Sequence, residues 1–123
     1  MKTILVTGVG GNVGQGILRC IQDRFPDLRL VGSNTEYFSA GFHLCEQCFE
    51  LPFAFDEGYI PAVADLVQQH SIDLIIPSTD FESYYLAKHQ NELDCPVAAS
   101  PSETTFIYLD KYLSWEHHRL HGI

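Results

Sequence analysis

Two short segments of the chain carry residues that could bind a ligand. The first is a glycine-rich turn, Gly8-Val9-Gly10-Gly11-Asn12-Val13-Gly14, which follows the apolar run Thr3–Thr7. When a strand enters such a turn and a helix leaves it, backbone N–H groups and the positive end of the helix point at one place, where an anion can bind. The turn therefore predicts a site for a phosphate or a carboxylate.

The second segment is Pro77-Ser78-Thr79-Asp80, which follows the continuous apolar run Asp73–Ile76. It offers hydroxyl groups, a carboxylate and a second helix N-terminus. In the common strand orders of open α/β sheets, the loops after the first and fourth strands meet where the chain reverses direction across the sheet. We therefore expect one crevice lined by both segments. Glu82 has the spacing to cap the helix at Thr79 and could also face this crevice.

Elements that could position these segments alternate along the chain. We expect strands at residues 3–7, 28–32, 48–51, 73–76 and 96–99. Helical patterns lie between and after them, over residues 13–24, 61–70 and 79–93, from residue 101 and up to residue 121. Alternation of this kind predicts an α/β fold, a Rossmann-like doubly wound parallel sheet of about five strands with helices on both faces.

Capping residues set the expected helix boundaries. Asn12 is predicted to cap the first helix, and Thr79 the helix after the fourth strand. Ser100 has the spacing of a second capping box, with Pro101 at the first helical position. Asp110 is predicted to cap the last helix, which ends at Gly122.

Composition limits the classes of partner. The 123 residues make one domain, and seven Lys+Arg against sixteen Asp+Glu give a formal charge of −9. That balance argues against nucleic acid and against an anionic membrane surface. No stretch has the length of a signal sequence or a membrane span, so we expect a cytoplasmic protein with reduced cysteines.

Other motifs have simpler interpretations. Cys45 and Cys48 form a lone Cys-x-x-Cys without the second pair that a structural zinc site needs, and they are predicted to be buried thiols. The Tyr84-x-x-x-Lys88 spacing of short-chain dehydrogenases falls too early in the chain for that family. His117 and His121 share one helix face, which we interpret as an exposed amphipathic surface; no metal site is predicted.

Taken in order, these segments resemble the N-terminal, or pre-ATP-grasp, domain of ATP-grasp ligases, especially those similar to the carbamoyl-phosphate synthetase large subunit. The resemblance covers essentially the whole chain. It is most specific in Ile75–Glu82 and in the ending Asp110-Lys111 with Gly122-Ile123. One departure is Asn34 at the end of the second strand, where many relatives carry aspartate.

The resemblance implies a function. Ligases of this kind use ATP to activate a carboxylate as an acylphosphate, which an amine or similar nucleophile then attacks. Their N-terminal domain supplies one wall of the acceptor-substrate site. Carried onto this sequence, the residues that bind the substrate are Gly8, Gly10, Gly11, Asn12, Val13, Asn34, Ser78, Thr79, Asp80 and Glu82. The family's lysine that reaches the nucleotide phosphates matches Lys111, a point charge suited to phosphate.

The resemblance also implies parts that lie outside these residues. Residues 1–109 would form the pre-ATP-grasp domain, and residues 110–123 the first helix leading into absent ATP-grasp lobes. Those lobes would hold ATP and Mg²⁺, so we expect the 123-residue chain to be inactive alone and to bind neither tightly. Its partners would be those lobes and a small carboxylate or amine. An apolar face around Phe106, Ile107, Tyr112 and Trp115 could instead drive a homodimer.

Two other functions stay open. A Rossmann domain that binds NAD(P), as in short-chain-dehydrogenase-like oxidoreductases, would also contain a glycine turn after its first strand. Its ribose normally needs an acidic residue at the end of the second strand, where this chain has Asn34. A non-catalytic nucleotide-sensing module is the third candidate. Tight stoichiometric binding of a nucleotide without turnover would support it.

Overall fold

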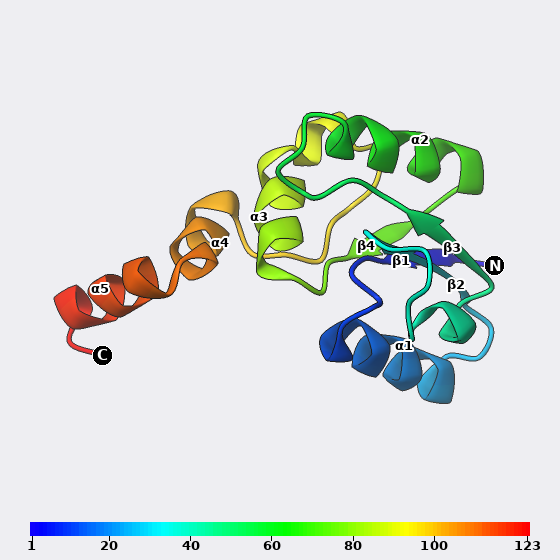
Figure 1. Cartoon of the computed structure of the whole chain (residues 1–123), viewed down its shortest axis with the longest axis horizontal. Coiled ribbons are helices and arrows are strands. Elements are labelled where there is room, and N and C mark those ends of the chain that lie inside the picture. The colour runs from blue at the N-terminus through cyan, green and yellow to red at the C-terminus, as the bar shows by residue number, and fades with distance from the viewer.

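The computed structural model describes all 123 residues, and its centre is a sheet of four parallel strands (Figure 1). These are β1 (Thr3–Val6), β2 (Arg29–Asn34), β3 (Gln47–Glu50) and β4 (Leu74–Ile76), in the order β3-β2-β1-β4. The chain reverses direction across the sheet between β1 and β4. The structure thus confirms the α/β class and the predicted switch point.

The expected fifth strand at residues 96–99 is reduced to one bridge between Val97 and Ile75. Ile75 N–H donates to the Pro96 carbonyl at 3.0 Å, and Ala98 N–H donates to the Ile75 carbonyl at 2.8 Å. The ladder stops there because the next donors on either side of this bridge would be Pro96 and Pro77, and neither proline has an N–H. The sheet therefore has four strands rather than five.

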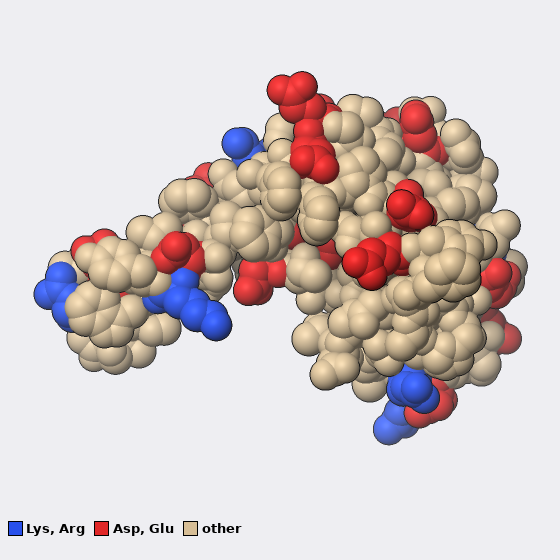
Figure 2. All heavy atoms as spheres, viewed as in Figure 1, with Lys and Arg blue, Asp and Glu red and all other residues tan.

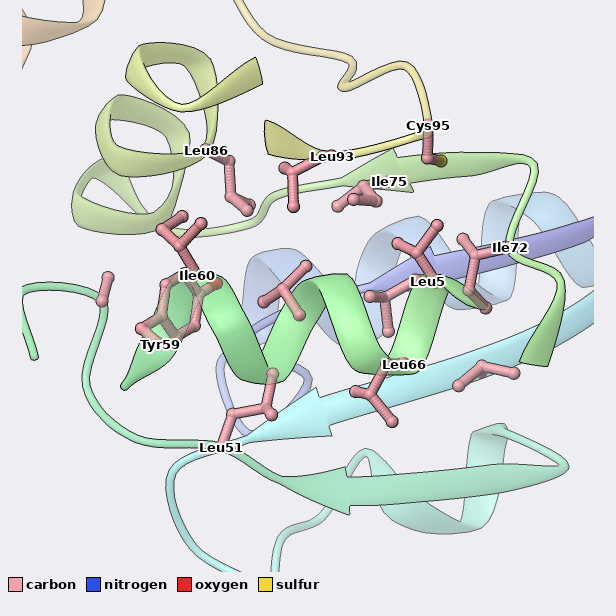
Figure 3. Close-up of a cluster of buried hydrophobic side chains, with 14 residues drawn as sticks. Leu5, Leu51, Tyr59, Ile60, Leu66, Ile72, Ile75, Leu86, Leu93 and Cys95 are labelled. Carbon is pink, nitrogen blue, oxygen red and sulfur yellow. The ribbon is translucent and has the colours of Figure 1, made fainter. Parts of the chain in front are cut away.

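Helices cover both faces of the sheet, as predicted. Helix α1 (Asn12–Arg24) packs on the face that presents Ile4 and Val6. Helices α2 (Tyr59–His70) and α3 (Asp80–Lys88) pack on the opposite face against Leu5 and Ile75, which Figure 3 shows among the side chains of this larger core. Successive residues of β1 thus serve two cores, because side chains of a strand alternate between faces.

Two predicted caps are wrong. Asn12 is the first residue of α1, and Gly11 occupies the N-cap position without a side-chain hydrogen bond. The Gln15 side chain donates to the Gly10 carbonyl and ties the turn to the helix instead. Helix α4 (Ser102–Leu109) begins after Pro101, which is itself the N-cap, so Ser100 caps nothing. Pro101, with φ −51°, therefore lies just before the helix and is not its first residue.

The last two helices form an arm that extends from the main body (Figure 1). Helix α4 packs on α3, and α5 (Lys111–His121) packs on α4. Asp110 caps α5, with Oδ1 accepting from the backbone N–H of Tyr112 and Leu113, and Gly122 ends the helix in the left-handed conformation. These two predictions are confirmed. Phe106, Tyr112 and Trp115 of the arm are about half exposed or more.

None of the helices has the length and apolar character needed to cross a membrane.

Candidate functional site

The two predicted ligand-binding turns lie against each other. β1 and β4 pair directly, and the Ser78 hydroxyl donates to the Gly8 carbonyl at 3.1 Å. Gly8 has φ +65°, and a Cβ added there would lie 2.6 Å from Ser78 Oγ and 2.9 Å from Glu82 Oε2. The left-handed conformation and the close packing both require glycine at this position. The prediction that the turns share one crevice is confirmed.

A cavity of about 300 Å³ opens at this edge of the sheet. Residues at the carboxyl ends of all four strands contribute to it, and its polar lining consists of Gly8, Asn34, Thr35, Thr79 and Glu82. Four of the predicted site residues, Gly8, Asn34, Thr79 and Glu82, therefore line one cavity. Because parallel strands bring their carboxyl ends to the same edge, the topology alone accounts for this grouping.

The other predicted site residues lie outside that lining. Gly10, Gly11, Asn12 and Val13 form the turn and the start of α1, and Ser78 lies beneath Gly8. Asp80 borders a separate hollow between α3 and α4. Lys111 lies exposed at the start of α5, on the arm.

Most N–H groups of the glycine turn are already used. Val9 N–H donates to the Ser33 carbonyl at 3.1 Å, Gly10 N–H to Asn34 Oδ1 at 3.2 Å, and Gly11 N–H to the Gly8 carbonyl at 3.1 Å. The N–H groups left for an anion are that of Gly8 and those of the first turn of α1, which has no intrahelical partners for them. The anion site expected in the turn is thus reduced to these groups.

Glu82 is the one charged side chain in the cavity, and only 9% of it is exposed. Its Oε1 accepts from the Tyr59 hydroxyl at 3.2 Å, and its Oε2 accepts from the Thr79 hydroxyl at 2.8 Å. Thr79 also accepts from the Glu82 backbone N–H at 3.2 Å, which confirms it as the cap of α3. The Glu82 carboxylate binds the hydroxyl of the cap and not its backbone N–H, so the reciprocal half of the predicted capping box is missing, while Glu82 does face the crevice.

Burial raises the pKa of Glu82, because the charged form loses solvation, and the hydroxyls of Thr79, Thr7 and Tyr59 oppose that effect. The Thr7 hydroxyl is itself buried and lacks a hydrogen bond of ordinary geometry. No Lys, Arg or His lines the cavity to stabilise the carboxylate. Figure 2 shows basic side chains on the arm and at the margins near α1 and α3, with acidic ones between.

This raised pKa predicts a pH-dependent stability. As pH rises above the ordinary value of 4.5, the unfolded chain loses the Glu82 proton before the folded chain does, so the free energy of unfolding falls until the folded pKa is passed. The free energy of unfolding of Glu82→Gln should therefore fall less than that of wild type as the pH rises from 4.5. Urea unfolding at a series of pH values measures this. Glu103→Gln, at an exposed acid of α4, is the control, and parallel curves for Glu82→Gln and wild type would refute the prediction.

Three phenylalanines at the cavity were missed in the sequence. Phe53 and Phe55 follow β3, and Phe81 lies in the first turn of α3. The rings of Phe53 and Phe55 stack at 5.3 Å, and Phe81 meets Phe55 edge-on at 6.2 Å. All three are about half exposed. The sequence did contain a signal for Phe53 and Phe55. They follow Pro52, which ends a strand, and loops after strands normally carry polar residues.

The remaining motifs lie away from this cavity. Cys45 and Cys48 are partly buried free thiols against Gly32, and desolvation raises both pKa values. Lys88 Nζ lies 5.6 Å above the Tyr84 ring rather than beside a cofactor site. No group of three or more His, Cys, Asp or Glu side chains is placed to hold a metal ion.

No protein-family model matches the sequence, and a search of curated proteins finds no match. Solved structures do resemble the fold. The L-amino acid ligase from Bacillus licheniformis matches 100% of this chain and 31% of its own, with a TM-score of 0.73 and 17% identity. N5-carboxyaminoimidazole synthetase from Staphylococcus aureus, complexed with ADP, matches 98% of this chain and 30% of its own, with a TM-score of 0.69 and 14% identity. The chain thus spans about a third of the length of these ligases.

A structure that contains NAD matches less of the chain. The dTDP-glucose 4,6-dehydratase from Bacillus anthracis str. Ames, in complex with NAD, matches 79% of this chain and 36% of its own, with a TM-score of 0.58 and 10% identity. The ligases match both the sheet and the α4–α5 arm, because they cover nearly every residue. The chain therefore has the Rossmann-like fold of the pre-ATP-grasp domains of ATP-grasp ligases.

Proposed function

We propose that this chain is the substrate-binding N-terminal domain of an ATP-grasp ligase, which activates a carboxylate as an acylphosphate for attack by an amine or similar nucleophile. The observation that carries the proposal is the match of nearly the whole chain to about a third of two different ligases. The predicted likeness to the carbamoyl-phosphate synthetase large subunit, and the division at residue 110, stay predictions within this proposal.

In this proposal the cavity is one wall of the acceptor-substrate site. Gly8, Asn34, Thr79 and Glu82 contact the substrate, since they line the cavity. Ser78 acts indirectly by holding the Gly8 carbonyl. Gly10, Gly11, Asn12 and Val13 shape the turn and would present the first N–H groups of α1 to an anionic group that binds outside the cavity. Asp80 borders the separate hollow between α3 and α4, so its contact with the substrate stays a prediction.

The cofactors would be ATP and Mg²⁺, bound by parts of the enzyme outside these residues. The ADP in the related synthetase supports nucleotide use. In this chain no three acidic, histidine or cysteine side chains lie together, so its residues do not fit a Mg²⁺ site, and we derive no metal-dependent step from them. Lys111 is exposed on α5, where it can reach the phosphates only of a nucleotide held by those other lobes.

NAD(P) binding is the second candidate, favoured by the likeness to the NAD-bound dehydratase. Two contacts argue against it. A dinucleotide site needs an acceptor for the ribose at the end of β2, but Asn34 already accepts from Gly10 N–H and donates to the Glu36 carbonyl. The Glu82 carboxylate also lies beside Gly8, where a pyrophosphate would meet like charge.

Calorimetric titration and an ATPase assay on the 123-residue chain separate the candidates. We expect no saturable binding of NADH and no turnover of ATP with Mg²⁺, because the proposal places the nucleotide site elsewhere. Stoichiometric NADH binding would favour the oxidoreductase. Tight ATP binding without turnover would favour the nucleotide-sensing module, and real ATP turnover would refute the inactivity of the chain alone.

The encoding DNA tests the ligase proposal directly. The reading frame is expected to continue past the codon for Ile123 by roughly one or two domain lengths, with a glycine-rich lid and an acidic metal pair. The longer product should release ADP only when both a carboxylate and a nucleophile are present. A reading frame that stops at Ile123 would contradict the proposal.

A further inference from the structure

The cavity pairs one buried carboxylate with three aromatic rings and has no cationic side chain in its lining. Resting on the proposed function, we infer that its ligand is the amine substrate of the ligase reaction, a primary amine with an aromatic or similarly flat apolar group. It binds here as the ammonium ion and must lose one proton to solvent before the free amine attacks. The carboxylate substrate would then bind outside this cavity. The inference names the substrate class, which the fold alone leaves open.

Glu82 provides the place for the ammonium group. Each of its oxygens accepts one hydrogen bond, from Tyr59 at 3.2 Å and from Thr79 at 2.8 Å. A carboxylate has about four acceptor positions, so roughly two remain for N–H donors of a ligand. A buried carboxylate without a cationic partner is costly, and a bound ammonium would supply the missing partner.

The aromatic wall provides the place for the rest of the ligand. Phe53 and Phe55 stack with their planes 4° apart and their centroids 5.3 Å apart, so no ligand fits between them. Each of the three rings is about half exposed and lines the cavity, so part of its surface is free to contact a ligand. An aromatic ligand can stack on these surfaces, and a nearby cation is attracted to the negative faces of the rings.

An anionic ligand would meet opposing charge in the same cavity. The lining offers no Lys, Arg or His, and the chain carries a formal charge of −9. The N–H groups of Val9, Gly10 and Gly11 already donate within the protein, so the glycine turn offers the lining only the N–H of Gly8. A carboxylate placed beside Glu82 would be repelled by it, and one neutral N–H group does not offset that repulsion.

Titration of the ¹⁵N-labelled 123-residue chain with three probes of similar shape tests the inference. We expect 2-phenylethylamine to shift the amide signals of Gly8 and Thr79 saturably. The neutral 2-phenylethanol and the anionic 3-phenylpropanoate should bind roughly tenfold or more weakly, because each lacks the charge-assisted hydrogen bond. Equal or tighter binding of either, or no saturable shift with the amine, would overturn the inference.

Matched variants locate the interaction. Glu82→Gln and Phe81→Ala should each weaken amine binding, roughly tenfold for the charge and several-fold for the ring. Glu103→Gln and Phe106→Ala, an exposed acid and a half-exposed ring on α4, are the controls and should leave it unchanged. Equal losses in the test and control variants would refute the site. If Glu82→Gln fails to fold, Phe81→Ala and the probe series decide.

These outcomes are independent of the test on the encoding DNA. If the chain binds the amine but the reading frame stops at Ile123, the inference about the ligand is supported and the ligase proposal is refuted. If the reading frame continues but the chain does not bind the amine, the ligase proposal is supported and the inference about the ligand is refuted.

Discussion

Gly41→Ala is expected to destabilise the domain by about 3 kcal/mol or more, the upper end of the usual cost of overpacking. A Cβ at Gly41 would lie 1.9 Å from the Val9 carbonyl oxygen and 2.7 Å from its carbonyl carbon. These are backbone atoms of the glycine turn, so no side-chain rotation relieves the contact. The segment between β2 and β3 must therefore move off the turn, or the turn must move off the sheet.

The melting temperature measures this effect. A loss of 3 kcal/mol in a domain of this size lowers it by roughly 10 °C or more. Gly16→Ala is the matched control, because a Cβ there meets nothing within 4 Å and Gly16 lies inside α1. That change should stabilise the chain by roughly 0.5–1 kcal/mol. If both variants melt within a degree or two of wild type, the close approach of Gly41 to Val9 is wrong.

The sequence indicated the fold because its strong patterns are local. The apolar runs before Gly8 and Pro77 are typical of buried parallel strands, and a glycine turn between such a strand and a helical pattern is typical of the first turn of a doubly wound sheet. The helix caps at Thr79 and Asp110 follow from side chains that reach their own backbone. Since parallel order fixes which strand ends meet, these local patterns were enough to place the crevice.

The parts that were missed depend on competition between distant groups. Asn12 fails as a cap, because Gly11 takes the N-cap position and the Gln15 side chain reaches back to the Gly10 carbonyl. Likewise Asn34 takes the Gly10 N–H that the anion prediction needed. Phe53 and Phe55 line the cavity only because the loop after β3 meets the turns that follow β1 and β4. No spacing within the sequence encodes such pairings.

Gly8→Ala is expected to cost roughly 2–4 kcal/mol in stability and to abolish binding in the cavity. The left-handed conformation at φ +65° costs a residue with a Cβ roughly 1–2 kcal/mol, and crowding adds a similar amount. The added methyl group would lie 2.6 Å from Ser78 Oγ and 2.9 Å from Glu82 Oε2. Both side chains must then shift, which breaks the hydrogen bond between the two turns and moves the carboxylate.

Gly11→Ala separates this effect from a general intolerance of the turn. A Cβ at Gly11 would have its nearest neighbour, the Gly8 carbonyl oxygen, at 3.6 Å, an ordinary contact, and its backbone is extended at φ −86°. Its cost should stay under about 1 kcal/mol, the difference between glycine and alanine at an N-cap. Urea unfolding and the 2-phenylethylamine titration measure both variants. Gly8 contacts both turns, whereas Gly11 only begins a helix. If both variants lose stability and amine binding equally, the turn as a whole determines the site, and the contact between Gly8 and Glu82 does not.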